Sequence, residues 1–336
     1  MERFAKIIVL LYLSLTVGCK TSRVYFPKDV QAVQVPIVRF DSALLHLDTT
    51  AIDQGITTLY ADYPYFMPIF CEDILGVYAS DTAYLKEALP QFLGDTVYGF
   101  RQTNAEVLRQ YADISGLQQS LNDAFARLLY LYPDWQVPTV YFFVSGFNAS
   151  ILFIENDIAV GVDMYLGSDY EYYNRVVYNY QKQTMRKECI PVDVVSAYLF
   201  RQVPFNSGQS RLLENMIYRG KMMYMLSLLF PDEPEYEIMG YTQQQWAWCE
   251  KYEADIWKRM IDKKDLFRSE SMVLTSYLND GPFTSEISQD APARLGTWTG
   301  WRICKAYMEN NKEVTLQELL QEPDAQKILE QSYYRP

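Results

Sequence analysis

A single β-rich stretch between two long helical regions most limits how this chain can fold. Short apolar runs at residues 139–144, 151–154 and 158–162 are rich in the β-branched and aromatic residues that favour strands. The turn-forming sequences Gly146-Phe147-Asn148 and Glu155-Asn156-Asp157 separate these runs. Three strands joined in this way predict a small antiparallel meander. Because the apolar residues follow one another without alternation, we expect at least one strand to be central, with helices on both faces.

Helical spacing dominates the rest of the chain. Apolar side chains recur three and four residues apart in residues 50–60, 115–132, 192–201 and 210–230, and residues 295–301 begin a helix with two tryptophans, which we expect in the core. Thr242 and Thr315 each begin a capping box, which predicts a helix start.

Two segments near the N-terminus are less regular. Residues 37–41 alternate like a short strand or an extended lead-in, and the prolines in residues 63–68 argue against a regular helix there. No linker divides the chain after residue 36. We therefore expect residues 36–336 to form one α+β domain, mainly helical, with a small antiparallel meander.

Composition limits the functions that are open to the chain. Its 336 residues are 49% apolar and carry a formal net charge of −12. This length and apolar share allow a large core and exclude a disordered protein. The acidic balance offers no basic surface for phosphates, so we expect no nucleic-acid partner. The one histidine, His46, excludes zinc sites that need two histidines within the chain, and we expect it to be a structural or surface residue.

The N-terminus has the pattern of a lipoprotein signal peptide. Arg3 and Lys6 precede an uncharged run at residues 7–17, followed by Gly18 and Cys19. The run is too short to cross a bilayer, which takes roughly 20 residues, but it suits a secretory signal. Small residues before a cysteine resemble a lipobox, which predicts removal of residues 1–18 and lipidation of Cys19. An ordinary signal peptide with an incidental cysteine is the alternative.

Lipidation would attach the protein to a membrane, because two or more acyl chains give stable anchoring. Residues 19–35 would then be a tether between the lipid and the domain at residues 36–336. Four further cysteines are present: Cys71, Cys189, Cys249 and Cys304. An oxidising envelope permits disulfides, with three possible full pairings. Cys249 and Cys304 lie beside tryptophans in helical stretches, where we favour buried free thiols.

Sequence blocks along the predicted mature chain resemble the gliding-motility lipoprotein GldB family. In order, the blocks are Tyr63-Pro64, residues 70–76, 145–148, 161–167, 216–221 and 240–242, and Gly300-Trp301. The resemblance covers nearly the whole mature chain. It implies a Bacteroidetes envelope lipoprotein that is associated with motility and related secretion machinery in gliding species. In this phylum an acidic run after the lipidated cysteine resembles a surface-export signal. Its absence after Cys19 favours an outer-membrane anchor with a periplasmic domain.

The family is also similar to predicted zinc proteases of the HExxH kind, which implies a degenerate zincin (gluzincin)-like fold. In that pattern a sheet precedes an active-site helix and a second helix that donates a glutamate. Residues 192–201 would be the active-site helix, and they contain no histidine. Arg219 stands in the second helix where relatives often have an acidic residue, and a guanidinium repels a metal cation. The resemblance therefore implies a pseudoenzyme without metal or cofactor.

Four polar residues are candidates for a vestigial cleft: Asp163, Tyr165, Glu214 and Arg219. Asp163 and Tyr165 follow a predicted strand, where a polar residue either lines a cleft or satisfies backbone donors. Arg219 lies in an apolar helix, and we expect it to pair with a buried carboxylate such as Asp163 or Glu214. Binding of an anionic ligand by Arg219 is the alternative.

The leading functional hypothesis is a lipid-anchored, non-catalytic envelope protein of GldB type. It would contact the membrane through its lipid and would act through contacts with other envelope proteins. Two alternatives belong to other classes. The first is a hydrolase or peptidase that retains a cryptic site. The second is a glycan-binding lipoprotein, which the 28 tyrosines would suit.

Overall fold

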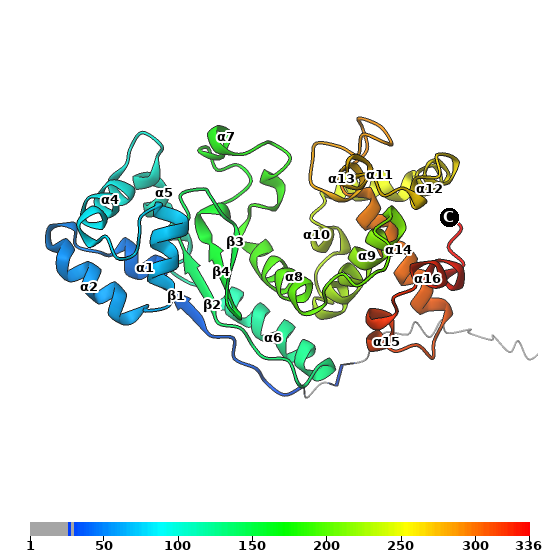
Figure 1. Ribbon diagram of the computed structural model, residues 1–336, viewed down its shortest axis with the longest axis horizontal. Coiled ribbons are helices and arrows are strands. Elements are labelled where there is room, and N and C mark those ends of the chain that lie inside the picture. Colours follow the sequence, from blue (N-terminus) through cyan, green and yellow to red (C-terminus); the bar gives the residue numbers. More distant parts are fainter. Residues whose placement is uncertain (1–25, 28–29) are drawn as a thin grey trace, which may run out of the picture.

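The computed structural model of the chain describes residues 26–27 and 30–336, so the predicted signal peptide, Cys19 and most of the predicted tether lie outside the described residues. The described part is mainly helical with one small sheet, which confirms the α+β prediction for a single domain. Figure 1 shows the sheet beside α1–α5, the helices α9–α16 at the opposite end, and α8 between these two parts.

The strands are β1 (Ile37–Arg39), β2 (Val140–Phe143), β3 (Ile151–Ile154) and β4 (Asp157–Gly161). The helices in the first half are α1 (Phe40–Leu45), α2 (Ile52–Asp62), α3 (Phe66–Ile69), α4 (Thr82–Gly94), α5 (Phe100–Gln110), α6 (Ser115–Leu131) and α7 (Tyr173–Val176). The second half has α8 (Ile190–Gln202), α9 (Leu212–Leu229), α10 (Glu235–Met239), α11 (Gln243–Lys251), α12 (Glu253–Asp262), α13 (Ser271–Leu278), α14 (Leu295–Asn310), α15 (Leu316–Gln321) and α16 (Ala325–Ser332). Short 3-10 helices include η3 (Val162–Met164) and η6 (Asp265–Phe267), and η2 (Phe70–Leu75) is a π-helix.

The sheet is mixed, so the predicted antiparallel meander is wrong. The strand order is β1-β2-β4-β3; β1 pairs with β2 and β2 with β4 in parallel, and only β3 and β4 are antiparallel. The short turns between successive strands favour pairing of each strand with the next one along the chain. Instead, the segment after β2 crosses the end of the sheet, so that β4, and not β3, lies beside β2. There the buried Asp163 carboxylate, just after β4, accepts hydrogen bonds from the backbone of Ser145 and Phe147, just after β2. This contact places the carboxyl ends of both strands at the same edge, as parallel pairing requires.

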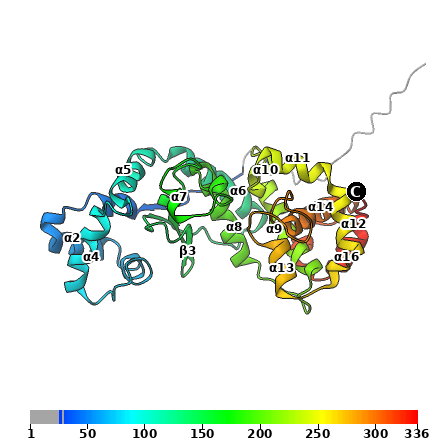
Figure 2. The ribbon, with the colours of Figure 1, turned by 90° about the horizontal axis from the view of Figure 1, so that it is seen from above.

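Residues 37–41 do contribute a strand, β1, and the two central strands are covered on both faces as expected. Phe142 and Val160 face a large cluster that includes α6 and α8, whereas Phe143 and Ala159 face a smaller cluster built from α1, α2, α3 and α4. This alternation follows from the two-residue period of a strand. Figure 1 shows α1, α2 and α4 on one side of the sheet and α8 on the other, and in Figure 2 β3 lies between α4 and α8.

The second half of the molecule is organised by the close packing of α9 against α14. A Cβ atom on Gly220 would lie 2.2 Å from the carbonyl carbon of Gly300, and one on Gly300 would lie 1.9 Å from the carbonyl oxygen of Met216. The two backbones therefore touch, which only glycine permits. The predicted core tryptophans are confirmed, since Trp298 and Trp301 on α14 are buried.

Most of the predicted helices are confirmed with small shifts at their ends, and both capping boxes are present at Thr242 and Thr315. The segment at residues 63–68 differs, because α3 begins at Phe66 and continues into η2. Pro68 lies in the first turn of α3, where a helix needs no N–H donor, so it is compatible with a helix.

Cys71, Cys189, Cys249 and Cys304 are free thiols, and Cys249 and Cys304 are buried as predicted. Burial raises the pKa of Cys189 and of Cys304 to about 12, which disfavours the reactive thiolate form of both. Among the residues that the structure describes, none of the helices is both long enough and apolar enough to span a bilayer.

Candidate functional site

A cleft of about 430 Å³ lies where the sheet, α8, α9, α10 and the start of α14 meet. Helix α8 presents one face to the cleft, with lining residues at positions that a helix brings to the same side. These residues are Val192, Asp193, Ser196, Ala197 and Phe200. The other walls come from the loop before β3, the segment around residues 177–185, and the side chains of Arg219 and Arg294.

Asp193 and Tyr165 form the polar centre of the α8 side. The Tyr165 hydroxyl donates a hydrogen bond of 2.9 Å to Asp193 Oδ2. Burial raises the pKa of the Asp193 carboxyl to about 6, although the Tyr165 hydrogen bond and the Arg294 charge act in the opposite direction. Burial likewise raises the pKa of Tyr165 well above its usual value. The pair thus offers a carboxyl group that changes charge in mildly acidic solution and a tyrosine that stays protonated.

Arg219 projects from α9 into the same cleft. Its guanidinium donates to the Leu278 carbonyl oxygen at 2.6 Å and to Asn279 Oδ1 at 3.3 Å. The expected pairing with Asp163 or Glu214 is wrong, because α9 turns this side chain toward the end of α13. Burial, and secondly the nearby Arg294 charge, lower the pKa of Arg219, and the Asp280 charge partly offsets them.

Arg294 supplies a second guanidinium from the residue that precedes α14. Its Nε lies 2.9 Å from Asp280 Oδ1, and its guanidinium stands over the Tyr241 ring. Arg294 has a φ of +60°, in the left-handed region that non-glycine residues rarely adopt. This conformation turns the chain into α14 while the side chain reaches the Met239 carbonyl oxygen at the cleft wall.

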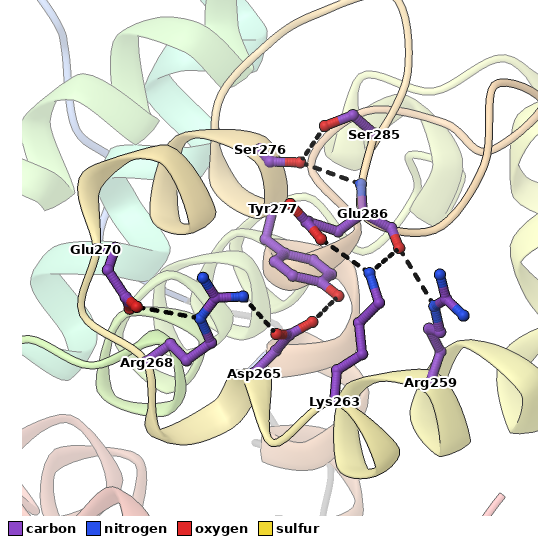
Figure 3. A network of polar contacts seen from close by, with 9 residues as sticks. All are labelled: Arg259, Lys263, Asp265, Arg268, Glu270, Ser276, Tyr277, Ser285 and Glu286. Carbon is purple, nitrogen blue, oxygen red and sulfur yellow. Dashed lines mark hydrogen bonds and ion pairs between the residues drawn. The ribbon is translucent and has the colours of Figure 1, made fainter.

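Figure 3 shows a polar network around α13 and the loop that follows it. Asp280 lies in this loop, and Arg294 lies at its end, directly before α14. The buried Asp265 carboxylate accepts a 2.8 Å hydrogen bond from the Tyr277 hydroxyl and a 3.2 Å contact from Arg268. Lys263 pairs with Glu286 at 2.9 Å. These contacts hold α13 and the following loop against η6 and α12. They thereby help to fix the positions of Asp280 and Arg294 at the cleft.

Asp163 has a different role from the cleft residues. Its carboxylate is fully buried and accepts from Ser145 N at 2.7 Å, Ser145 Oγ at 3.0 Å and Phe147 N at 2.8 Å. It does not line the cleft. Of the two readings left open for Asp163, the structure therefore favours the satisfaction of backbone donors.

Glu214 lies apart from the cleft as well. It forms an ion pair with Arg211 and lines a second hollow of about 400 Å³ on the other side of α9, beside Trp135 and Lys221. The structure thus brings Tyr165 and Arg219 to one cleft and leaves Asp163 and Glu214 elsewhere. Sequence reasoning missed Asp193, Asp280 and Arg294. Asp193 could have been noticed in the sequence, because it is an acidic residue within the apolar first turns of α8. Nothing in the local sequence pattern marks Asp280 or Arg294 as cleft residues.

The described residues offer few side chains that could bind a metal ion together. His46 is exposed, with Nδ1 2.8 Å from the Ser42 carbonyl oxygen. Within residues 26–27 and 30–336, no three His, Cys, Asp or Glu side chains are grouped so that they could hold a metal ion. What the cleft does offer is hydrogen-bond donors, two guanidinium groups and aspartate carboxyls.

The fold and the cleft define a mainly helical α+β protein with a cleft, lined by apolar and charged side chains, between its sheet-bearing part and its helical part. The sequence model of one family, described as "Gliding motility protein GldB", matches residues 25–336. The chain belongs to this family, and membership indicates a gliding-motility-related protein of the cell envelope. Neither the curated proteins nor the solved structures compared with the chain gave a match. The resemblance to zincins therefore remains a prediction.

Proposed function

We propose that this chain is a lipid-anchored envelope protein that acts in gliding-motility or related envelope machinery through contacts with other proteins, without catalysing a reaction. Its lipid, on Cys19, would attach it to the outer membrane with the folded domain in the periplasm. Family membership supports a role in gliding motility at the cell envelope, and the N-terminal sequence supports the lipid anchor.

The chemistry of the α8–α9 cleft is the observation that carries the non-catalytic part of the proposal. Helix α8 lines the cleft with valine, aspartate, serine, alanine and phenylalanine, and α9 adds the guanidinium of Arg219. A positive charge at this wall opposes the binding of a metal cation. The same groups suit recognition, because guanidinium groups bind carboxylates with defined geometry.

Membrane fractionation tests the anchor. We expect Cys19→Ala to move the protein from the membrane to the soluble fraction, because the acyl chains that hold it would be missing. Cys189→Ala, at a partly exposed thiol on the folded domain, is the matched control and should stay in the membrane. Retention of the Cys19→Ala protein in the membrane would rule out lipid anchoring through this residue.

Crosslinking in intact cells tests the protein contacts. A photoreactive residue at an exposed position such as Tyr78 or Phe153, which are 81% and 49% exposed, should capture a defined envelope protein. Recovery of the same partner from independent preparations would support the proposal. If positions all over the domain recover no repeated partner, the protein does not work through stable contacts.

Metal analysis of the purified protein separates this proposal from a cryptic peptidase. We expect less than stoichiometric zinc, and no change in thermal stability when a chelator is added. A stoichiometric metal whose removal lowers the melting temperature would overturn the pseudoenzyme interpretation, because structural or catalytic metal contributes folding free energy.

A further inference from the structure

The outer edge of β3 is open along one side of the cleft. In the described chain β3 pairs with β4 alone. The turn of the β3–β4 hairpin joins Ile154 to Asp157, and at the other end of the hairpin Ser150 lies directly opposite Gly161. The Gly161 N–H donates to the Ser150 carbonyl oxygen at 2.9 Å. Residues of an antiparallel pair alternate between facing the partner strand and facing away. The backbone N–H and C=O groups of Ile151 and Phe153 are therefore directed away from β4.

This edge borders the cleft. Ser150 and Ile151 line it together with residues of α8 and of the segment around residues 181–185. A shallower hollow lined by Phe153, Glu155, Phe200 and Arg201 continues along the same strand, and Phe200 belongs to both hollows. A groove thus follows β3 from Phe153 to the polar end of the cleft.

An open edge with apolar side chains is unusual in a soluble domain. Unpaired strand edges invite pairing with other chains, and proteins normally blunt them with charge, proline or a covering segment. Phe153 is nevertheless 49% exposed, and the Arg201 guanidinium lies over its ring at 5.1 Å. The pattern is typical of a strand that receives a partner, where backbone hydrogen bonds provide affinity and neighbouring pockets provide specificity.

The far end of the groove holds charges of both signs, because the carboxyl groups of Asp193, Glu237 and Asp280 line it beside two guanidinium groups. Arg219 and Arg294 both line it, and Asp280 pairs with Arg294. The acceptors of Arg219 are a backbone carbonyl and an amide oxygen, which carry no formal charge. Within the described chain no ion pair joins Arg219 to a carboxylate, so its guanidinium leaves room for a carboxylate from a partner.

We propose that an extended segment of a partner polypeptide adds to β3 as a further strand and places a carboxylate beside Arg219 and Arg294. The carboxylate belongs to an acidic side chain or to a chain end. This inference rests on the proposed function, since it names the surface through which the protein would contact its partner.

Other occupants fit these groups less well. An apolar small molecule would leave the outward N–H and C=O groups of Ile151 and Phe153 without partners, which is costly once water is excluded. The sheet edge of a second copy belongs to a folded domain, whereas the cleft beside Ser150 and Ile151 is also lined by α8 and by residues around 181–185. A single extended chain needs less room than a folded domain and offers alternating donors and acceptors at strand spacing.

Peptide arrays probed with the detergent-solubilised full chain test the proposal. Three sets of short random peptides would be used. The first has a central aspartate or glutamate and an amidated end, the second has a free carboxyl end and no acidic side chain, and the third has neither group. We expect retention on the first or second set, which identifies the source of the carboxylate. Retention on none of the sets would overturn the proposal, and equal retention on the third set would overturn the role of the carboxylate.

Ile151→Pro tests the backbone contacts. Proline removes one outward N–H and leaves the bonds between β3 and β4 in place, so binding of a retained peptide should weaken roughly tenfold, the effect of one lost hydrogen bond. Ile151→Val keeps the N–H and should bind normally. Phe153→Lys puts a charge on the edge and should weaken binding even if Ile151→Pro folds poorly, whereas Tyr84→Lys, at a tyrosine that is 56% exposed on α4, should not.

Unchanged binding by Phe153→Lys and by folded Ile151→Pro would overturn the proposal. A wild-type dimer in light scattering that either variant dissociates would assign the edge to a second copy instead. Capture of an envelope partner in cells through another surface would leave the proposed function intact while this inference failed.

Discussion

The Tyr165 hydroxyl donates a 2.9 Å hydrogen bond to Asp193 Oδ2, and this contact joins the end of the sheet to the first turn of α8. Tyr165 is 2% exposed, and the carboxyl of Asp193 lies at the cleft wall. The contact therefore orients the ionisable group of α8 within the cleft.

The pH dependence of stability should reveal Asp193. Its pKa is raised from 3.8 to about 6 by burial, so the folded state keeps a proton that the unfolded state has released. Between about pH 4 and pH 6 this residue should make the free energy of unfolding fall as the pH rises. Asp193→Asn removes that loss. Urea unfolding over a pH series measures the free energy of unfolding of the variant minus that of wild type. We expect this difference to increase from about pH 4 to pH 6 and to stay constant at higher pH. A difference that does not vary with pH would contradict this assignment.

Gly300 should not tolerate a side chain. In Gly300→Ala the new methyl group would lie 1.9 Å from the Met216 carbonyl oxygen, so α9 and α14 must separate, at a cost of about 1–3 kcal/mol or more. Gly116→Ala is the matched control, because no atom lies within 4 Å of its Cβ position in α6. We expect the control to be neutral or more stable by roughly 0.5–1 kcal/mol. Chemical unfolding of both variants measures the contrast, and equal stabilities would show that the helices do not touch there.

Two tyrosines that pack on Trp135 should respond oppositely to loss of their hydroxyl groups. The Tyr132 hydroxyl is buried and finds no hydrogen-bond partner in the described chain, whereas the Tyr198 hydroxyl donates to the Gln136 carbonyl oxygen at 2.6 Å. Tyr132→Phe should leave the free energy of unfolding unchanged or raise it, and Tyr198→Phe should lower it by about 1 kcal/mol. Thermal and urea unfolding of the pair would decide. A large loss in Tyr132→Phe would mean that its hydroxyl has a partner.

Asp163 should matter for stability and not for recognition. Asp163→Ala removes the acceptor of the Ser145 and Phe147 N–H groups, and buried donors without partners should cost about 2–5 kcal/mol. Asp163→Asn retains one acceptor oxygen and should lose less. A folded Asp163→Ala protein of normal stability would show that these N–H groups are satisfied in another way.

The helical part of the fold could be read from the sequence because its signals are local. The capping boxes at Thr242 and Thr315 and the apolar spacing in α6 and α9 each lie within a few neighbouring residues. The strands were recognised for the same reason. Their order was not, because parallel pairing of β2 with β4 depends on how the segment between them packs.

The candidate site shows the same division. Tyr165 was found because it follows a strand, and Arg219 because a charged residue in an apolar helix is conspicuous. Their partners could not be found in this way. Arg219 reaches Leu278, which is 59 residues away, and Asp193 is 28 residues from Tyr165.

The sequence by itself determined the class of fold, the family, the N-terminal pattern that predicts an anchor, and the exclusion of a two-histidine site, because each depends on residue types and local spacing. Only the tertiary structure decided which polar groups share the cleft, that Asp163 is a structural residue, and that the edge of β3 is open. These depend on contacts between distant segments, which form when α8, α9 and α14 bury their apolar faces together.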